Sequence, residues 1–143
     1  MGDIVEMYRD AVEPLGRDRF ACSLATWELL QEVGQTFGWR PIGATYVAPA
    51  QLHVESPARR NYRPGSAPDQ KRIEHEDAVA WASALELAKD SPHLAAMIMA
   101  RAAAIKAADG PVGAVRLPGV MEEFIEFAYG GTFTFVLGSA ARP

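Results

Sequence analysis

Proline spacing is the feature of this sequence that most restricts its fold. Five of the ten prolines fall between residues 41 and 68. Proline lacks an amide proton and disfavours a helix in the residue before it, so no long helix can cross this stretch. The apolar residues between the prolines follow no sustained period. We therefore predict a proline-rich irregular loop at about 40–70, and loops of this length in a compact domain are usually functional.

The rest of the chain has the composition of one ordinary globular domain. It has 143 residues, of which 49% are hydrophobic and 22% charged. This length is typical of a single hydrophobic core, and this composition differs from that of a disordered chain. We predict a single domain over residues 1–143.

Several features predict a cytoplasmic protein that does not enter a membrane. The longest apolar run, residues 94–105, is too short to span a bilayer and contains Arg101. Residues 1–8 include two acids and lack the basic and apolar regions of a signal peptide. The single cysteine, Cys22, cannot form an internal disulfide, which agrees with a reducing compartment. The excess of arginine over lysine and the many alanines favour a bacterial origin.

Apolar periodicity predicts four to five helices on the two sides of the loop. Ser23 can cap the first long helix and Gly38 can end it. Ser91 followed by Pro92 is typical of another helix start, and we expect the helix that follows to form a hairpin with the one before it. The expected helices cover residues 4–12, 24–37, 76–89, 92–110 and 117–129.

Short strands are expected between these helices. Residues 132–135 alternate polar and apolar side chains, as a half-buried strand does. Residues 19–22, 44–47 and 71–73 are shorter candidates. The predicted fold class is α+β, mainly helical, with a small antiparallel sheet of short strands.

No motif in the sequence indicates catalysis, a metal or a cofactor. The segment Gly110 to Gly113 lacks the lysine and hydroxyl residue of a phosphate-binding loop, and its proline removes an amide donor. The charged cluster Glu74 to Asp77 is explained by the positive end of a helix dipole. We therefore assign no catalytic residue, no metal ligand and no cofactor.

The region richest in candidate binding residues is an arginine-bearing segment inside the loop. Arginines beside an aromatic ring can bind phosphates, bases or an acidic protein surface. The net charge of −4 argues against nucleic acid, which leaves an acidic protein partner or a solvated loop whose charge the acidic helices balance. The candidate binding residues are Arg59, Arg60, Tyr62, Arg63, Arg72 and Trp39.

Three stretches carry a resemblance to other proteins. They are residues 25–30 with 37–45, residues 76–85, and residues 124–127 with 131–133. In these stretches the chain resembles a group of short uncharacterised bacterial proteins. The resemblance implies a bacterial fold but assigns no activity, ligand or partner to any residue, and residues 48–70 depart from the group's pattern.

The sequence favours a non-enzymatic protein-binding module, of the kind that serves as an immunity or adaptor protein. The alternative is a small enzyme or ligand-binding protein with a pocket between the helices and the sheet, which would use Cys22, His75 or the pair Glu122 and Glu126. The alternative requires these groups to converge in one cleft. The Ala-rich helix at 92–108 has few charges, so it can be buried within the protein or form a homodimer.

Overall fold

The computed structural model describes residues 3–9, 19–46, 62, 64 and 71–139. In these residues the fold is α+β, as predicted, with five helices and five strands. The strands are β1 (Asp3–Tyr8), β2 (Arg19–Ser23), β3 (Thr45–Tyr46), β4 (Lys71–Ile73) and β5 (Phe133–Ser139). The helices are α1 (Leu24–Thr36), α2 (His75–Ala88), α3 (Pro92–Ala100), α4 (Ala102–Asp109) and α5 (Gly113–Tyr129).

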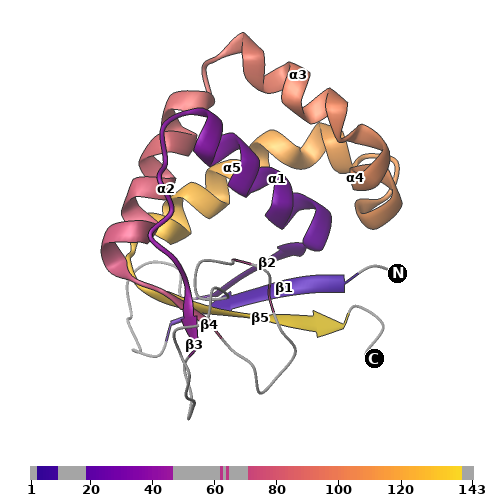
Figure 1. The fold of residues 1–143 in the computed structure, drawn as a ribbon. Helices are drawn as coiled ribbons and strands as arrows, with labels where there is room; N and C mark the ends of the chain where they lie inside the picture. The colour runs from indigo at the N-terminus through magenta and orange to yellow at the C-terminus, as the bar shows by residue number, and fades with distance from the viewer. Residues whose placement is uncertain (1–2, 10–18, 47–61, 63, 65–70, 140–143) are drawn as a thin grey trace.

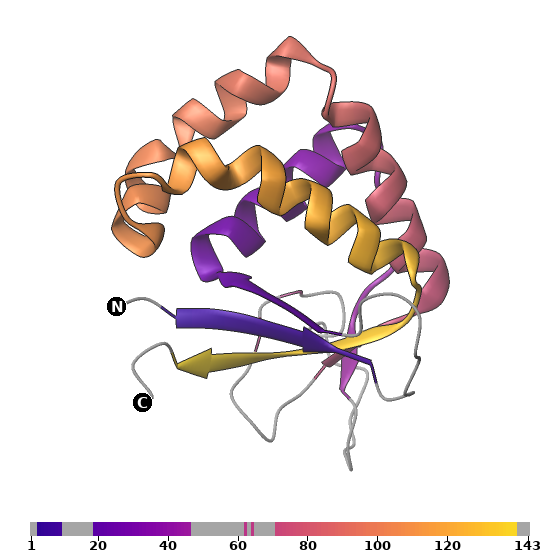
Figure 2. The ribbon, with the colours of Figure 1, turned by 180° about the vertical axis from the view of Figure 1, so that it is seen from behind.

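The strands form one antiparallel sheet in the order β2-β1-β5-β4-β3. The helices lie together on one side of this sheet, so the fold has two main layers (Figures 1 and 2). The side chains of Val5, Met7, Phe133 and Phe135 are buried on the strands at the centre of the sheet. The core therefore lies between the sheet and the helices α1, α2 and α5.

The predicted N-terminal helix at 4–12 is wrong, because residues 3–8 form the strand β1. This strand lies inside the sheet, between β2 and β5. Val5 and Met7 are fully buried, whereas Glu6 between them is exposed. Pairing on both edges and the burial of alternate residues stabilise a strand here.

The predicted start of α1 is confirmed. The Ser23 side chain accepts a hydrogen bond from the backbone N–H of Thr26 at 3.1 Å and caps the helix. Gly38 follows the helix with a φ of +112°, a conformation that glycine adopts without strain. Gly34, in the last turn of α1, contacts α2 closely: a Cβ atom at this position would lie 2.6 Å from Trp81 Cδ1.

The segment predicted as one helix at 92–110 contains two helices. Arg101 leaves the helical conformation with a φ of −112° and ψ of 13°, which separates α3 from α4. The predicted hairpin with α2 is also wrong, because α2 packs mainly against α5 and α1. The last helix begins at Gly113 rather than near residue 117, and Pro118 lies inside it.

An aromatic cluster forms the centre of the core. Trp27 contacts Trp81 and Phe135, with ring centroids 5.3 and 4.8 Å apart. Trp39 stacks on Trp81 at 4.4 Å with the two rings nearly parallel. These contacts join α1, α2 and β5. The ring of Tyr62 packs against the same cluster, beside Trp39, Trp81 and Phe135.

Candidate functional site

A buried carboxylate lies beside Tyr62 and the segment that follows α1. Asp77, in the first turn of α2, is only 1% exposed. Its Oδ1 accepts hydrogen bonds from Trp39 Nε1 at 2.9 Å and from the Ile42 backbone N–H at 3.2 Å. Its Oδ2 accepts a short hydrogen bond from the Tyr62 hydroxyl. These three donors, together with the helix N-terminus, offset the cost of burying a carboxylate.

Tyr62 forms the other half of this cluster. Its hydroxyl also accepts a hydrogen bond from the Gly43 N–H at 2.7 Å, and its backbone carbonyl accepts one from Trp27 Nε1 at 2.8 Å. Burial, and then the hydrogen bond to Asp77, raise the pKa of the Tyr62 phenol above its usual value. The phenol therefore stays protonated and continues to donate to Asp77.

We call Trp39, Tyr62 and Asp77 the Asp77 cluster. It links α2, the segment after α1 and one point of the proline-rich loop by hydrogen bonds between buried groups. Each of these side chains is at most 5% exposed. The cluster therefore fixes the side chain of Tyr62, and its polar atoms are too buried to reach a substrate, as a catalytic group must.

From the sequence, Asp77 was expected to interact favourably with the positive end of the α2 dipole. Its burial was not predicted. A signal for burial was present, because Asp77 precedes Trp81 by four residues and Leu85 by eight. Residues at this spacing share one face of a helix. A carboxylate on the apolar face of α2 must find buried donors, and two of those donors are the aromatic residues of the predicted binding set.

The predicted binding residues do not form one site in the described structure. Arg59, Arg60 and Arg63 lie outside the described residues. Tyr62 and Trp39 come together in the Asp77 cluster, with ring centroids 5.4 Å apart. Arg72 lies half-buried on β4, opposite Thr134 of β5. Its neighbours in the strand, Lys71 and Ile73, are buried, so Arg72 leaves the sheet on the face away from the helices.

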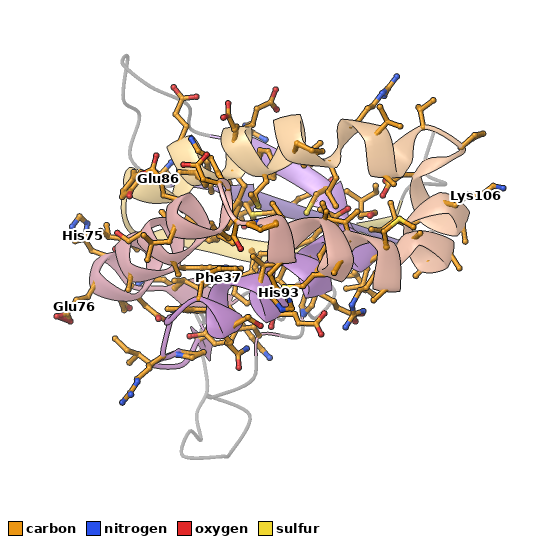
Figure 3. The ribbon with its side chains drawn as sticks, turned by 90° about the horizontal axis from the view of Figure 1, so that it is seen from above. Phe37, His75, Glu76, Glu86, His93 and Lys106 are labelled. Carbon is orange, nitrogen blue, oxygen red and sulfur yellow. The ribbon has the colours of Figure 1, made fainter. Side chains whose placement is uncertain are left out.

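The polar groups of the enzyme alternative lie in different places. The Cys22 thiol is buried on β2, and burial raises its pKa above the usual value, so it is a poor nucleophile. His75 is exposed at the start of α2 and points away from the helices (Figure 3). Glu122 and Glu126 are exposed on α5 beside Lys89 and Tyr129. Among the described residues, no group of three or more histidine, cysteine or acidic side chains could hold a metal ion.

A second candidate region is the outer surface of α3 and α4. Although α3 is rich in apolar residues, Leu94 is its only buried residue, and Met99 is 72% exposed. A shallow depression of about 650 Å³ lies along these helices. It is lined by Glu32, His93, Ala96, Met97, Ala100, Arg101, Ala103 and Ala104. We call the surface formed by these residues and Met99 the α3–α4 face.

The two charged residues of this face, Glu32 and Arg101, are paired with each other. Arg101 Nε donates to Glu32 Oε1 at 2.8 Å, and Arg101 Nη1 lies 3.7 Å from Glu28 Oε1. These pairs connect the break between α3 and α4 to α1. They leave a largely uncharged centre, which is unusual for the exposed surface of a helix.

The chain matches no protein-family model, no curated protein and no solved structure. In the part of the chain that the structure describes, no helix has both the length and the apolar character needed to cross a membrane. The Asp77 cluster and the α3–α4 face are therefore the two features of the described structure that bear on function.

Proposed function

We propose that this protein is a non-enzymatic protein-binding module of the bacterial cytoplasm, of the immunity or adaptor type. Its proposed contact residues are Arg59, Arg60 and Arg63, with an acidic surface of another protein as the partner. Arginine suits this role because its planar guanidinium can bind a carboxylate through two parallel hydrogen bonds.

One observation carries this proposal: Tyr62, which stands between these arginines in the sequence, is fixed by the Asp77 cluster. Its hydroxyl contacts Asp77 and its carbonyl accepts from Trp27. Fixing one residue of a binding segment before the partner arrives lowers the entropy lost on association. This fixed point in the middle of an arginine-rich segment is the feature that supports a recognition role.

Affinity capture from the native host tests this proposal. The wild type is compared with a variant in which Arg59, Arg60 and Arg63 are all changed to Ala. The matched control changes three exposed arginines elsewhere, Arg19→Ala, Arg40→Ala and Arg116→Ala, and alters the net charge by the same amount. We expect the wild type and the control to retain a specific partner that the loop variant loses. Capture of the same proteins by all three, or of none by the wild type, would contradict the proposal.

The variant Tyr62→Phe tests the hydrogen bond between Tyr62 and Asp77 separately from the charges of Arg59, Arg60 and Arg63. It keeps every arginine but removes the hydroxyl that donates to Asp77. We expect this variant to fold and to bind the captured partner more weakly than the wild type, because the segment must then be ordered during binding. Unchanged affinity would show that this hydrogen bond makes no contribution to recognition.

We also propose a second copy of the chain as a partner. The supporting observation is the α3–α4 face, where an apolar helix buries only one of its residues. An interface of this kind is compatible with the arginine-bearing segment, because the two surfaces involve different residues.

A further inference from the structure

The helices α3 and α4 bury few side chains against the rest of the protein. The structure describes every residue of both helices, and each helix buries one residue, Leu94 in α3 and Ile105 in α4. Met97 and Ile98 add partial contacts with the core. The 17 residues of α5 alone bury seven. Because segments with few buried apolar contacts open most easily, α3 and α4 should open at a lower free energy than α5.

The connections of the chain allow α3 and α4 to open without the other helices. The helices before and after them in the sequence, α2 and α5, pack directly against each other. In both views α3 lies on the side of the helical layer away from the sheet (Figures 1 and 2). Gly110 ends α4 with a φ of +88°, a conformation that suits glycine, and offers a hinge. The core between the sheet and α1, α2 and α5 therefore does not depend on residues 92–109.

Polar contacts at two points hold these helices against α1. At the break between α3 and α4, Arg101 Nε donates to Glu32 Oε1 at 2.8 Å. At the end of α4, Asp109 Oδ2 accepts a hydrogen bond from the Ser23 hydroxyl at 2.8 Å and one from the Thr26 hydroxyl at 3.3 Å. Ser23 and Thr26 are each 3% exposed. Such contacts between side chains break at modest cost, in contrast to a large buried apolar surface.

We infer that residues 92–109, which form α3 and α4, are a lid on α1 that opens as one unit while the sheet and the other three helices stay folded. Opening breaks the two polar contacts with α1 and exposes the hydroxyl groups at its start, together with the buried side chains of the lid. The lid thus controls access to the N-terminal end of α1. This inference goes beyond the proposed function and depends on neither the arginine-bearing segment nor a second copy.

Native-state hydrogen exchange on the full chain, measured at low urea concentrations, tests the inference. The hydrogen-bonded amides of α3 and α4 should share one opening free energy, below that of the amides in α2 and α5. Their exchange should also depend only weakly on urea, because opening the lid exposes less surface than global unfolding does. The inference is overturned if α3 and α4 exchange with the free energy and urea dependence of α2 and α5, or if they open at two different free energies.

The variant Tyr62→Phe separates opening of the lid from global unfolding. It removes a hydrogen bond to Asp77, which lies in the core and stays intact when the lid opens. Amides of α2 and α5 that exchange through global unfolding should therefore exchange faster in this variant, whereas those of α3 and α4 should keep their wild-type rates. Equal acceleration in all four helices would show that the lid does not open by itself.

The variant Asp109→Ala tests the contact at the end of α4. It removes the acceptor for Ser23 and Thr26, so amides of both α3 and α4 should exchange about tenfold faster. Alanine forms helices better than aspartate, so an effect confined to α4 itself would slow exchange instead. The control Glu126→Ala removes an exposed carboxylate from α5 and should leave the lid unchanged. Unchanged or slower exchange, or acceleration in α4 without α3, would refute a single lid.

Discussion

The contact between Gly34 and Trp81 gives the sharpest test of the packing. The change Gly34→Ala would add a Cβ atom 2.6 Å from Trp81 Cδ1 and 2.8 Å from Trp81 Nε1. Trp81 cannot move away easily, since it is fully buried and donates to the Leu30 carbonyl at 2.9 Å. It is also stacked against Trp39. The added methyl group must therefore push α1 away from α2.

Two opposing effects set the magnitude. Replacing glycine by alanine inside a helix favours folding by up to about 1 kcal/mol, and by less near a helix end such as position 34. Overpacking a well-filled core typically costs about 1–3 kcal/mol. Because the gain is small near the helix end and the added Cβ would lie within 3.0 Å of a ring that is held in place, the cost outweighs the gain, and we expect the free energy of unfolding of Gly34→Ala to fall by about 1–2 kcal/mol.

Urea unfolding followed by circular dichroism and tryptophan fluorescence measures this change. Gly119→Ala is the matched control, because Gly119 lies inside α5 and a Cβ atom there would meet nothing within 4 Å. The control should be more stable than the wild type by up to about 1 kcal/mol. If Gly34→Ala is as stable as the wild type while Gly119→Ala is stabilised, the close packing of α1 on Trp81 is refuted.

Two further predictions concern the Asp77 cluster and the buried thiol. Tyr62→Phe should lower the free energy of unfolding by about 1–3 kcal/mol, since it leaves the buried Asp77 carboxylate with one donor fewer, and urea unfolding at neutral pH measures this. Stability should also fall in alkali, because the raised pKa values of Tyr62 and Cys22 mean that the unfolded chain loses these protons before the folded one. The contribution of each group is complete below its ordinary pKa, 10.0 for Tyr62 and 9.0 for Cys22, and is lost as the pH rises above that value. Unfolding free energies measured across this range should decline less steeply for Tyr62→Phe, and an equal decline would contradict the assignment.

The elements predicted correctly are those whose type or starting point depends on residues within or next to the element itself. Ser23 supplies the side-chain cap of α1, and Ser91 with Pro92 starts α3 in the same local way. The strand at residues 133–139 showed its alternation in the sequence, although it is longer than expected. These signals act between neighbouring residues, so distant contacts in the folded protein do not change the structure that they predict.

The features that the sequence missed depend on distant partners. Ile4 and Met7 have helical spacing, but β2 and β5 together determine that the N-terminal segment is a strand. When a segment pairs with a strand on each of its edges, this pairing outweighs a helical spacing of its apolar residues. The burial of Asp77 likewise depends on donors from Trp39 and Tyr62, which lie 38 and 15 residues away. A single sequence does not show such distant pairs.

The strand order also affects how the protein folds during synthesis. The central position of the sheet belongs to β5, which lies between β1 and β4 and brings the two ends of the chain to the same side of the molecule (Figure 1). Because β5 is translated after the other four described strands, β1 and β4 have no partner on one edge until residues 133–139 leave the ribosome. Exposed strand edges promote aggregation, and pairings between distant segments form slowly. The sheet therefore closes only once β5 has been translated, and a nascent chain stalled before β5 would depend on chaperones to keep those edges apart.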